Sequence, residues 1–229
     1  MGIPRETLQG VEPAVLEAFE SVVTTLQTLG TKMIDIALPN MRYALSTYYL
    51  IAPSEASSNL ARFDGVHYGY RTKKADSAEW LYSKSRGEGF GKEVKLRIML
   101  GTYALSSGYY DAYYLKANQV RQLILSDFEA AFKKCQAILI PTSPTTAFKL
   151  GDKSEDPITM YLSDVFTLPI NLAGIAGISV PCGMDAKSLP IGVQFIGKAF
   201  AEETILQMAH VYEKSRGAFA RPLSFDEKG

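Results

Sequence analysis

The sequence predicts an α/β fold in which helices cover a mixed β-sheet. Three observations support this. A helix-periodic segment at 13–29 lies between two short strand-like segments, a short apolar strand follows at 137–141, and two strand-like runs at 177–183 and 190–197 flank a polar connection. Strands that alternate with helices favour a sheet with helices packed on it. A chain of 229 residues can bury its own core, and we expect one continuous domain over 1–229.

The first segments predict a parallel crossover unit. Pro13 suits the first turn of a helix and Gly30 a stop after it. Residues 2–4 resemble the end of a strand, and residues 34–38 alternate like a strand. A strand, a helix and a strand in this order favour parallel pairing. The apolar positions of the helix recur at helical spacing: Val15, Phe19, Val22, Leu26 and Leu29. A unit that starts at the first residue leaves little sheet upstream for pairing.

The middle of the chain is predicted to be helical with interruptions. Residues 43–61 look helical, but Pro53 should break or kink that helix. Residues 92–134 contain further helices, with breaks expected at Gly101 and Gly108.

Composition excludes several classes of protein. The formal net charge is zero, so charge alone indicates no nucleic-acid surface. Cys135 and Cys182 lie far apart and form neither a metal-type spacing nor a disulfide framework, which favours a reducing compartment. No apolar run reaches the ~18 residues of a membrane span. The first residues contain no signal-peptide core.

Histidine and glycine patterns give no catalytic motif. His67 is expected to be a loop residue, and His210 a surface or packing residue of an amphipathic helix at 202–216. The stretch RGEGFGK at 86–92 departs from a phosphate-binding loop at both its first glycine and its Ser/Thr position, so we expect a flexible loop there.

Hydroxyl-rich segments do not supply a nucleophile either. PTSPTTAF, 141–148, has two prolines and no adjacent base, so Ser143 is expected to belong to a structured turn. No GxSxG elbow occurs. The residues alone therefore predict no self-sufficient catalytic group.

Three polar residues lie in apolar surroundings. Tyr48 is inside an apolar helix, Arg97 lies in KEVKLRIMLG, and Asp164 begins the glycine-rich run 164–183. The neighbours of Arg97 predict partial burial. Arg97 and Asp164 could pair as a structural bridge. Alternatively they face a zwitterionic ligand, with Arg97 on its carboxylate and Asp164 on its ammonium, where glycine permits close approach.

Long stretches of the chain closely resemble one branch of a known family. These stretches are 44–71, 93–117, 138–148, 161–183 and 189–206. They resemble the A subunits of glutamyl-tRNA(Gln) amidotransferases, within the amidase signature family. The resemblance implies a mixed sheet with helices on both faces. It also implies hydrolysis of glutamine to ammonia, which converts Glu-tRNA(Gln), or Asp-tRNA(Asn) in some organisms, to the amidated product.

The resemblance also implies partners and a location. The B subunit of such an enzyme would bind the misacylated tRNA and use ATP and Mg²⁺ to activate it, and the small C subunit would complete a heterotrimer. No cofactor is expected on this chain itself. The expected location is the cytoplasm of a bacterium or the matrix or stroma of an organelle.

Site residues follow by motif position. Tyr48, Arg97 and Asp164 match the residues of the family that hold glutamine, although Leu96 replaces an arginine that the family often has. The Gly/Ser-rich segment that carries the family's serine nucleophile, cis-peptide serine and lysine has no match here; the serines at 57–58 and 106–107 do not fit it. We therefore expect the carboxyl-terminal half of such a subunit, without catalytic residues.

Two further hypotheses stay open at this point. The chain could belong to a relative in the same family that hydrolyses other amides, although Arg97 and Asp164 together favour an amino-acid substrate. It could also be a non-catalytic remnant that serves as a scaffold for a partner.

Overall fold

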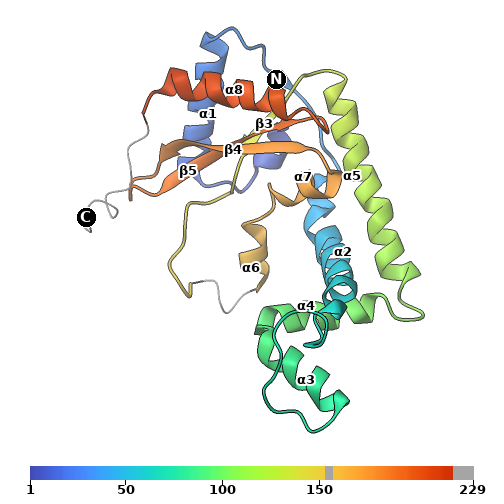
Figure 1. Ribbon diagram of the computed structural model, residues 1–229. Helices are drawn as coiled ribbons and strands as arrows, with labels where there is room; N and C mark the ends of the chain where they lie inside the picture. Colours follow the sequence, from blue (N-terminus) through green and yellow to red (C-terminus); the bar gives the residue numbers. More distant parts are fainter. Residues whose placement is uncertain (153–156, 219–229) are drawn as a thin grey trace, which may run out of the picture. The chain divides into compact units, whose positions relative to one another are not determined.

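The computed structural model describes residues 1–152 and 157–218, with side chains left out at 157–159 (Figure 1). The chain forms two compact units. The sheet unit comprises Met1–Leu45 and Arg121–Gly229, and the helical unit comprises Ser46–Val120. The expectation of one continuous domain over 1–229 stays a prediction.

The sheet unit is built on a mixed five-stranded sheet in the order β2-β1-β3-β5-β4. Its strands are β1 Gly2–Ile3, β2 Ile34–Asp35, β3 Ile138–Pro141, β4 Ala176–Met184 and β5 Pro190–Gly197. Strand β1 pairs in parallel with β2 and β3, whereas β5 pairs antiparallel with β3 and β4. The predicted mixed α/β sheet is therefore confirmed.

Helix α1, Pro13–Thr28, connects the parallel strands β1 and β2, so the predicted crossover unit is confirmed. Gly30 follows the helix with φ at +89°, a conformation that glycine adopts at little cost. Strand β2 is shorter than the predicted 34–38, but Ile36 and Leu38 are still buried. The buried positions of α1 are Val15, Phe19, Val22, Val23 and Leu26.

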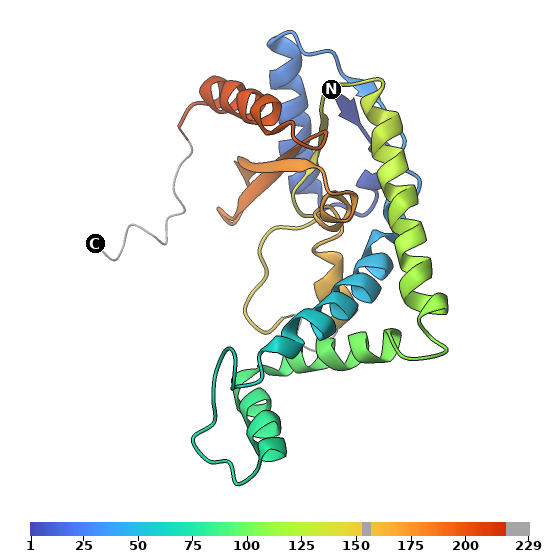
Figure 2. The ribbon, with the colours of Figure 1, turned by 45° about the vertical axis from the view of Figure 1, so that its right-hand side comes forward.

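Helices cover both faces of the sheet. Helices α1 and α8, Glu202–Arg216, pack on β4 and β5 and on each other (Figure 2). Adjacent residues of a strand point to opposite faces. A side chain at Gly197 would meet Ile205, so this face of the sheet is covered by α8. Gly177 pairs with Ile196, the residue before Gly197, and therefore points to the other face. A side chain at Gly177 would meet Ile170 of helix α7, Leu168–Ala173, which covers that face.

Helix α5, Lys116–Phe132, is tied to α7 because the Arg121 Nε atom donates a 2.7 Å hydrogen bond to the Leu172 carbonyl. The predicted closing helix at 202–216 is confirmed, with Ile205, Ala209 and Tyr212 buried. The remaining short elements of this unit are the 3₁₀ turns Arg5–Leu8 and Met41–Tyr43 and helix α6, Pro157–Leu162.

The helical unit contains most of α2, and all of α3 and α4. These helices span Ala44–Asn59, Ala78–Gly89 and Lys92–Ala104. A 3₁₀ turn at Leu60–Arg62 follows α2, and a π-helical turn at Asp111–Leu115 precedes α5. Helix α3 begins after Ser77, whose Oγ accepts a hydrogen bond from the Trp80 amide at 3.2 Å.

Two local predictions for this unit are wrong, those at Gly101 and at 86–92. At Pro53 the expected break does not occur, because α2 continues through it, and the alternative of a kink there stays a prediction. Gly101 does not break α4 but lies inside it. The position requires glycine because a Cβ there would overlap the carbonyl oxygen of Pro53. The loop expected at 86–92 is mostly helical, since α3 ends at Gly89 and α4 begins at Lys92. Gly108, with φ at +86°, does lie in the break after α4.

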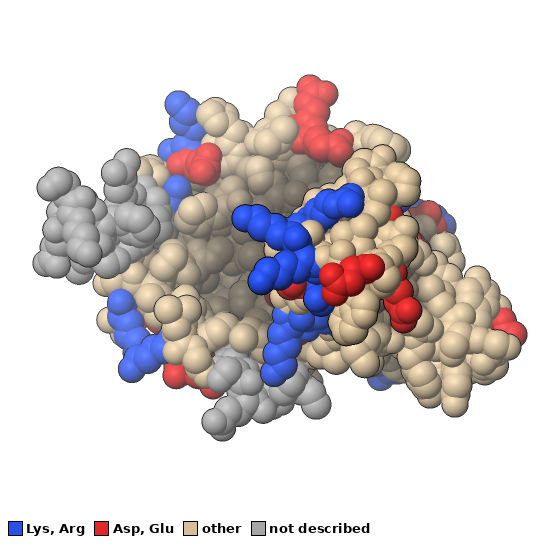
Figure 3. Space-filling view, turned by 60° about the horizontal axis from the view of Figure 1, so that its bottom comes forward, with Lys and Arg blue, Asp and Glu red and all other residues tan. Residues whose placement is uncertain are grey.

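Figure 3 shows one face of the molecule, on which Lys and Arg side chains gather near the middle and Asp and Glu side chains lie beside them. Within 1–152 and 157–218, no helix combines the length and the apolar character that a bilayer crossing needs.

Candidate functional site

Arg97 and Tyr48, two residues of the predicted site, meet in the helical unit. Arg97 lies on α4 and Tyr48 on α2, and the Arg97 Nη1 atom is 3.4 Å from the Tyr48 hydroxyl. The close approach of these helices at Gly101 and Pro53 makes this contact possible, because any larger residue at Gly101 would separate them.

Two further residues hold the Arg97 guanidinium. The Nε atom donates to Glu93 Oε1 at 2.9 Å, one helical turn earlier on α4. The Tyr49 ring lies 5.9 Å from the guanidinium carbon and meets the Tyr48 ring edge to face. The Glu93 hydrogen bond raises the pKa of Arg97 above its ordinary value; partial burial opposes this, and the Tyr48 contact supports it.

The guanidinium is therefore fixed at one edge and open at another. Nε and Nη1 have the partners above, whereas Arg97 Nη2 has no hydrogen bond to any residue in the described part of the chain. A planar fork with free N–H groups is suited to bind a carboxylate through two parallel hydrogen bonds. Sequence reasoning did not identify Glu93, although an acid four residues before an arginine on a predicted helix is a recognised signal.

The prediction that the segment around Arg97 is partly buried holds for Arg97 and Ile98 but not for the other apolar neighbours. The Arg97 side chain is 32% exposed. Leu96, Met99 and Leu100 are 45%, 70% and 47% exposed. Helix α4 buries only the side that carries Gly101 and Ala104, so its apolar residues on the other side remain on the surface.

Asp164 lies in the sheet unit, between α6 and α7. Its carbonyl accepts hydrogen bonds from the amides of Thr167 and Leu168, both at 3.0 Å, and so begins α7. Its side chain is exposed, and its carboxylate has no hydrogen bond or ion pair within the described ranges. Asp164 thus offers a free carboxylate on a backbone segment that is itself held in place.

Two side chains anchor that segment. The Gln194 Nε2 atom donates to the Phe166 carbonyl at 3.1 Å and to the Pro141 carbonyl at 3.2 Å, and Gln194 is buried. The Ser143 hydroxyl donates to the Ser163 carbonyl at 3.4 Å, which links the segment after β3 to the segment before Asp164. Sequence reasoning missed Gln194, whose only signal is one amide in the apolar strand PIGVQFIG.

The structure thus brings Tyr48 and Arg97 together and describes Asp164 within its own unit. That all three hold one ligand stays a prediction. The ion partner that the structure shows for Arg97 is Glu93, which sequence reasoning did not anticipate.

The histidines take no part in this arrangement. His67 lies in a loop, as expected, where its Nδ1 atom is 2.8 Å from Asp64 Oδ2. Hydrogen bonds from His67 and from the amides of His67 and Val66 hold the pKa of Asp64 well below its usual range. His210 is exposed on α8. In the part of the chain that the structure covers, no cluster of three His, Cys, Asp or Glu residues is arranged to hold a metal ion.

Known proteins are similar to this chain in both sequence and fold. Residues 1–206 match the family model described as Amidase. The chain is 55% identical over 222 residues to the glutamyl-tRNA(Gln) amidotransferase A subunit of Heliobacterium modesticaldum, covering 96% of this chain and 45% of that protein. It is also 55% identical over 216 residues to the protein of the same name from Geobacter metallireducens, covering 94% and 44%.

Solved structures of related proteins match the fold of this chain. The crystal structure of the glutamyl-tRNA(Gln) amidotransferase A subunit from Thermotoga maritima matches with a TM-score of 0.70 and 41% identity, over 93% of this chain and 41% of that one. An amidase crystal structure with 20% identity and a TM-score of 0.72, over 95% and 45%, shares the fold. The chain spans less than half the length of these relatives. Because the family model covers most of its residues, the chain belongs to the Amidase family.

Proposed function

We propose that this chain is the glutamine-binding part of the A subunit of a glutamine-dependent glutamyl-tRNA(Gln) amidotransferase. The observation that carries the proposal is the Arg97 guanidinium, held by Glu93 and Tyr48 with a free Nη2 edge. The identity to proteins of that name supports it.

Each residue of the proposed site has a role that its chemistry permits. Arg97 binds the α-carboxylate of glutamine with its fork, and the Tyr48 hydroxyl contacts the same end of the ligand. Asp164 binds the α-ammonium, since its carboxylate is free and exposed. These contacts orient the side-chain amide toward a nucleophile that residues outside this chain supply.

The complete enzyme would then work as follows. Glutamine is hydrolysed to glutamate, and the ammonia released replaces the activated side-chain oxygen of a misacylated tRNA. The partner B subunit performs the activation with ATP and Mg²⁺, and the C subunit completes a heterotrimer. The enzyme would work in the cytoplasm or in an organelle.

The proposal is tested in a full-length subunit carrying this segment, assembled with its partners. Replacing Arg97 by Ala removes a charge-assisted contact that contributes about 1.5–3 kcal/mol, so the KM for glutamine should rise roughly tenfold to more than a hundredfold. Lys95→Ala is the matched control, because Lys95 carries the same charge on the same helix and its Nζ atom bonds the Gly87 carbonyl. An unchanged KM in the Arg97 variant would show that helix α4 does not contribute to the glutamine site.

The ammonium role of Asp164 has its own test. Asp164→Asn should weaken glutamine binding more than it weakens binding of glutaramate, the analogue without the α-amine, because only glutamine presents the ammonium. Equal losses for both ligands would contradict the role.

Ammonia release tests the division of labour. The 229-residue chain alone should release no ammonia from glutamine. Release would place a nucleophile among residues interpreted as structural, and Ser143 and the serines at 106–107 would be substituted next.

A further inference from the structure

We propose that Glu93 is a positioning residue for the ligand carboxylate: it holds the Arg97 guanidinium by its Nε edge, so that the opposite edge is presented to the ligand. This inference rests on the proposed function and adds to it a residue that acts through Arg97. The supporting contact is the 2.9 Å hydrogen bond from Arg97 Nε to Glu93 Oε1.

The geometry of the contact determines which edge remains. A guanidinium has five N–H groups in a fixed plane, one on Nε and two on each terminal nitrogen. Glu93 accepts a hydrogen bond from Nε, and the Tyr48 hydroxyl lies beside the terminal nitrogen Nη1. Nη1 keeps a second N–H beside those of Nη2, so a carboxylate binds at the edge formed by Nη1 and Nη2, where two parallel hydrogen bonds can form.

The surroundings of the pair leave the positioning to Glu93. The Tyr49 ring contacts the guanidinium without fixing its rotation in the plane. The Tyr48 contact, at 3.4 Å, is long for a hydrogen bond. Of the contacts that the structure gives Arg97, only the one to Glu93 is short and directional, so the orientation of the fork depends on it.

The simpler interpretation is an ordinary surface ion pair. Glu93 and Arg97 are four residues apart on a helix, and their side chains are 55% and 32% exposed. Such pairs contribute little to stability. The two interpretations separate by experiment, since an ordinary pair affects helix stability slightly and leaves ligand affinity unchanged.

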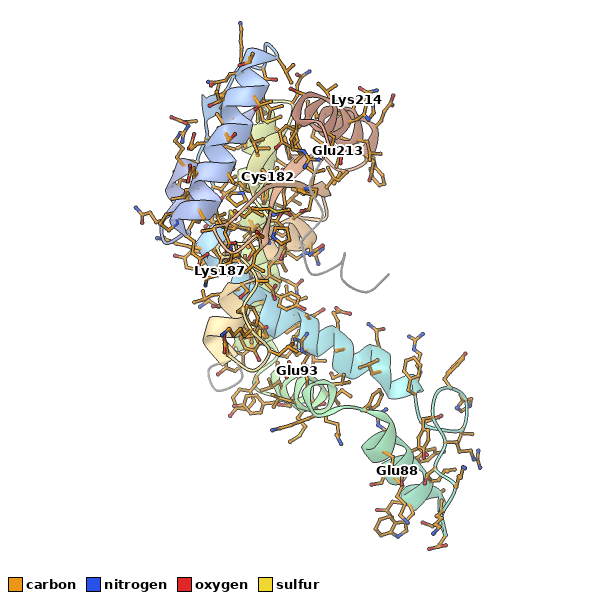
Figure 4. All side chains as sticks on the ribbon, turned by 90° about the vertical axis from the view of Figure 1, so that its left-hand side faces the viewer. Glu88, Glu93, Cys182, Lys187, Glu213 and Lys214 are labelled. Atoms are coloured by element: carbon orange, nitrogen blue, oxygen red, sulfur yellow. The ribbon has the colours of Figure 1, made fainter. Side chains whose placement is uncertain are left out.

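A matched control exists on the neighbouring helix. Glu79 is the second residue of α3, as Glu93 is the second residue of α4, so both carboxylates lie in a first turn and interact similarly with the helix dipole. Glu79 is exposed and has no hydrogen bond or ion pair within the described ranges. Figure 4 labels Glu93 on α4 and Glu88 on α3. The control residue Glu79 lies nine residues before Glu88 on α3.

The test measures the Kd of glutamine and of glutaramate for a full-length subunit that carries this segment. Glu93→Ala should raise both Kd values about fivefold, because the free arginine must be immobilised again on binding. Glu93→Gln keeps an oxygen acceptor for Nε and should remain within about twofold of the parent. Glu79→Ala should change neither Kd, and the Tm of every variant should stay close to that of the parent.

Three results would overturn the inference. Unchanged affinity in Glu93→Ala, with a reduced affinity in Arg97→Ala, would leave the proposed function standing and remove the role of Glu93. A loss for glutamine but not for glutaramate would show that Glu93 contacts the ammonium instead. Equal losses in Glu93→Gln and Glu93→Ala would show that charge, not orientation, matters. If Arg97→Ala itself binds normally, the proposed function fails first.

Discussion

Replacing Gly101 by Ala should destabilise the helical unit, although alanine is the better helix former. Gly101 lies inside α4, where a Cβ would overlap the carbonyl oxygen of Pro53 and lie 2.8 Å from the Ser54 amide nitrogen. Both neighbours belong to the backbone of α2, so no side-chain rotation relieves the overlap. The two helices must separate by about 1 Å or more.

The magnitude follows from two opposing effects. Forcing an extra methyl group into a packed contact costs about 1–3 kcal/mol. Helix propensity returns about 0.5–1 kcal/mol when glycine becomes alanine. Gly87→Ala isolates the second effect, because Gly87 lies inside α3 and a Cβ there meets nothing within 4 Å. We expect Gly87→Ala to stabilise the unit and Gly101→Ala to destabilise it, with a difference of about 1–3 kcal/mol, since the propensity gain is common to both variants.

The assay is urea unfolding followed by far-UV circular dichroism and by tryptophan fluorescence. The chain has a single tryptophan, Trp80, which lies on α3 and therefore reports on the helical unit. In the full-length subunit, Gly101→Ala should also weaken glutamine binding, because separating α2 from α4 moves Tyr48 away from Arg97. Equal or greater stability of Gly101→Ala relative to Gly87→Ala would refute the reasoning.

Two further predictions concern the sheet unit. Burial raises the pKa of the Cys182 thiol to about 11, so at pH 8.5 iodoacetamide should alkylate it roughly a hundredfold more slowly in the folded chain than in urea; equal rates by mass spectrometry would contradict the burial. Because the folded pKa is raised, the neutral thiol stabilises the fold below the unfolded pKa, and this contribution is lost as the pH rises toward about 11. Gln194→Leu leaves the carbonyls of Pro141 and Phe166 without their donor and should lower the free energy of unfolding by about 2–4 kcal/mol. The control is Gln207→Leu, on the exposed side of α8, which should change the free energy of unfolding by less than about 0.5 kcal/mol.

The sequence predicted the sheet unit well where local patterns and tertiary packing agree. Helix α1 has one apolar face and clear signals at both ends, Pro13 and Gly30, and its crossover between parallel strands follows from the order of elements. The strands at 137–141 and 190–197 are apolar because they lie in the middle of the sheet.

The helical unit was harder to predict because glycine and proline have more than one structural use. Gly101 was expected to break a helix but permits a helix contact, and Pro53 lies within the helix on the other side of that contact. Whether a glycine ends a helix or meets another backbone depends on a partner distant in sequence.

The candidate site was predicted in part. Tyr48, Arg97 and Asp164 came from motif positions, and the contact between the first two is seen in the structure. Glu93 and Gln194 were missed because each acts through another group, the former on a guanidinium and the latter on two carbonyls. Such supporting roles depend on geometry that a linear sequence does not contain.

The most direct measurement is a crystal structure of a full-length subunit carrying this segment with glutamine bound. We predict that the α-carboxylate of glutamine contacts the Nη1 and Nη2 atoms of Arg97, with Glu93 still on Nε, and that the α-ammonium contacts Asp164. Glutamine bound away from Arg97, or with its carboxylate held by other residues, would contradict the proposed site.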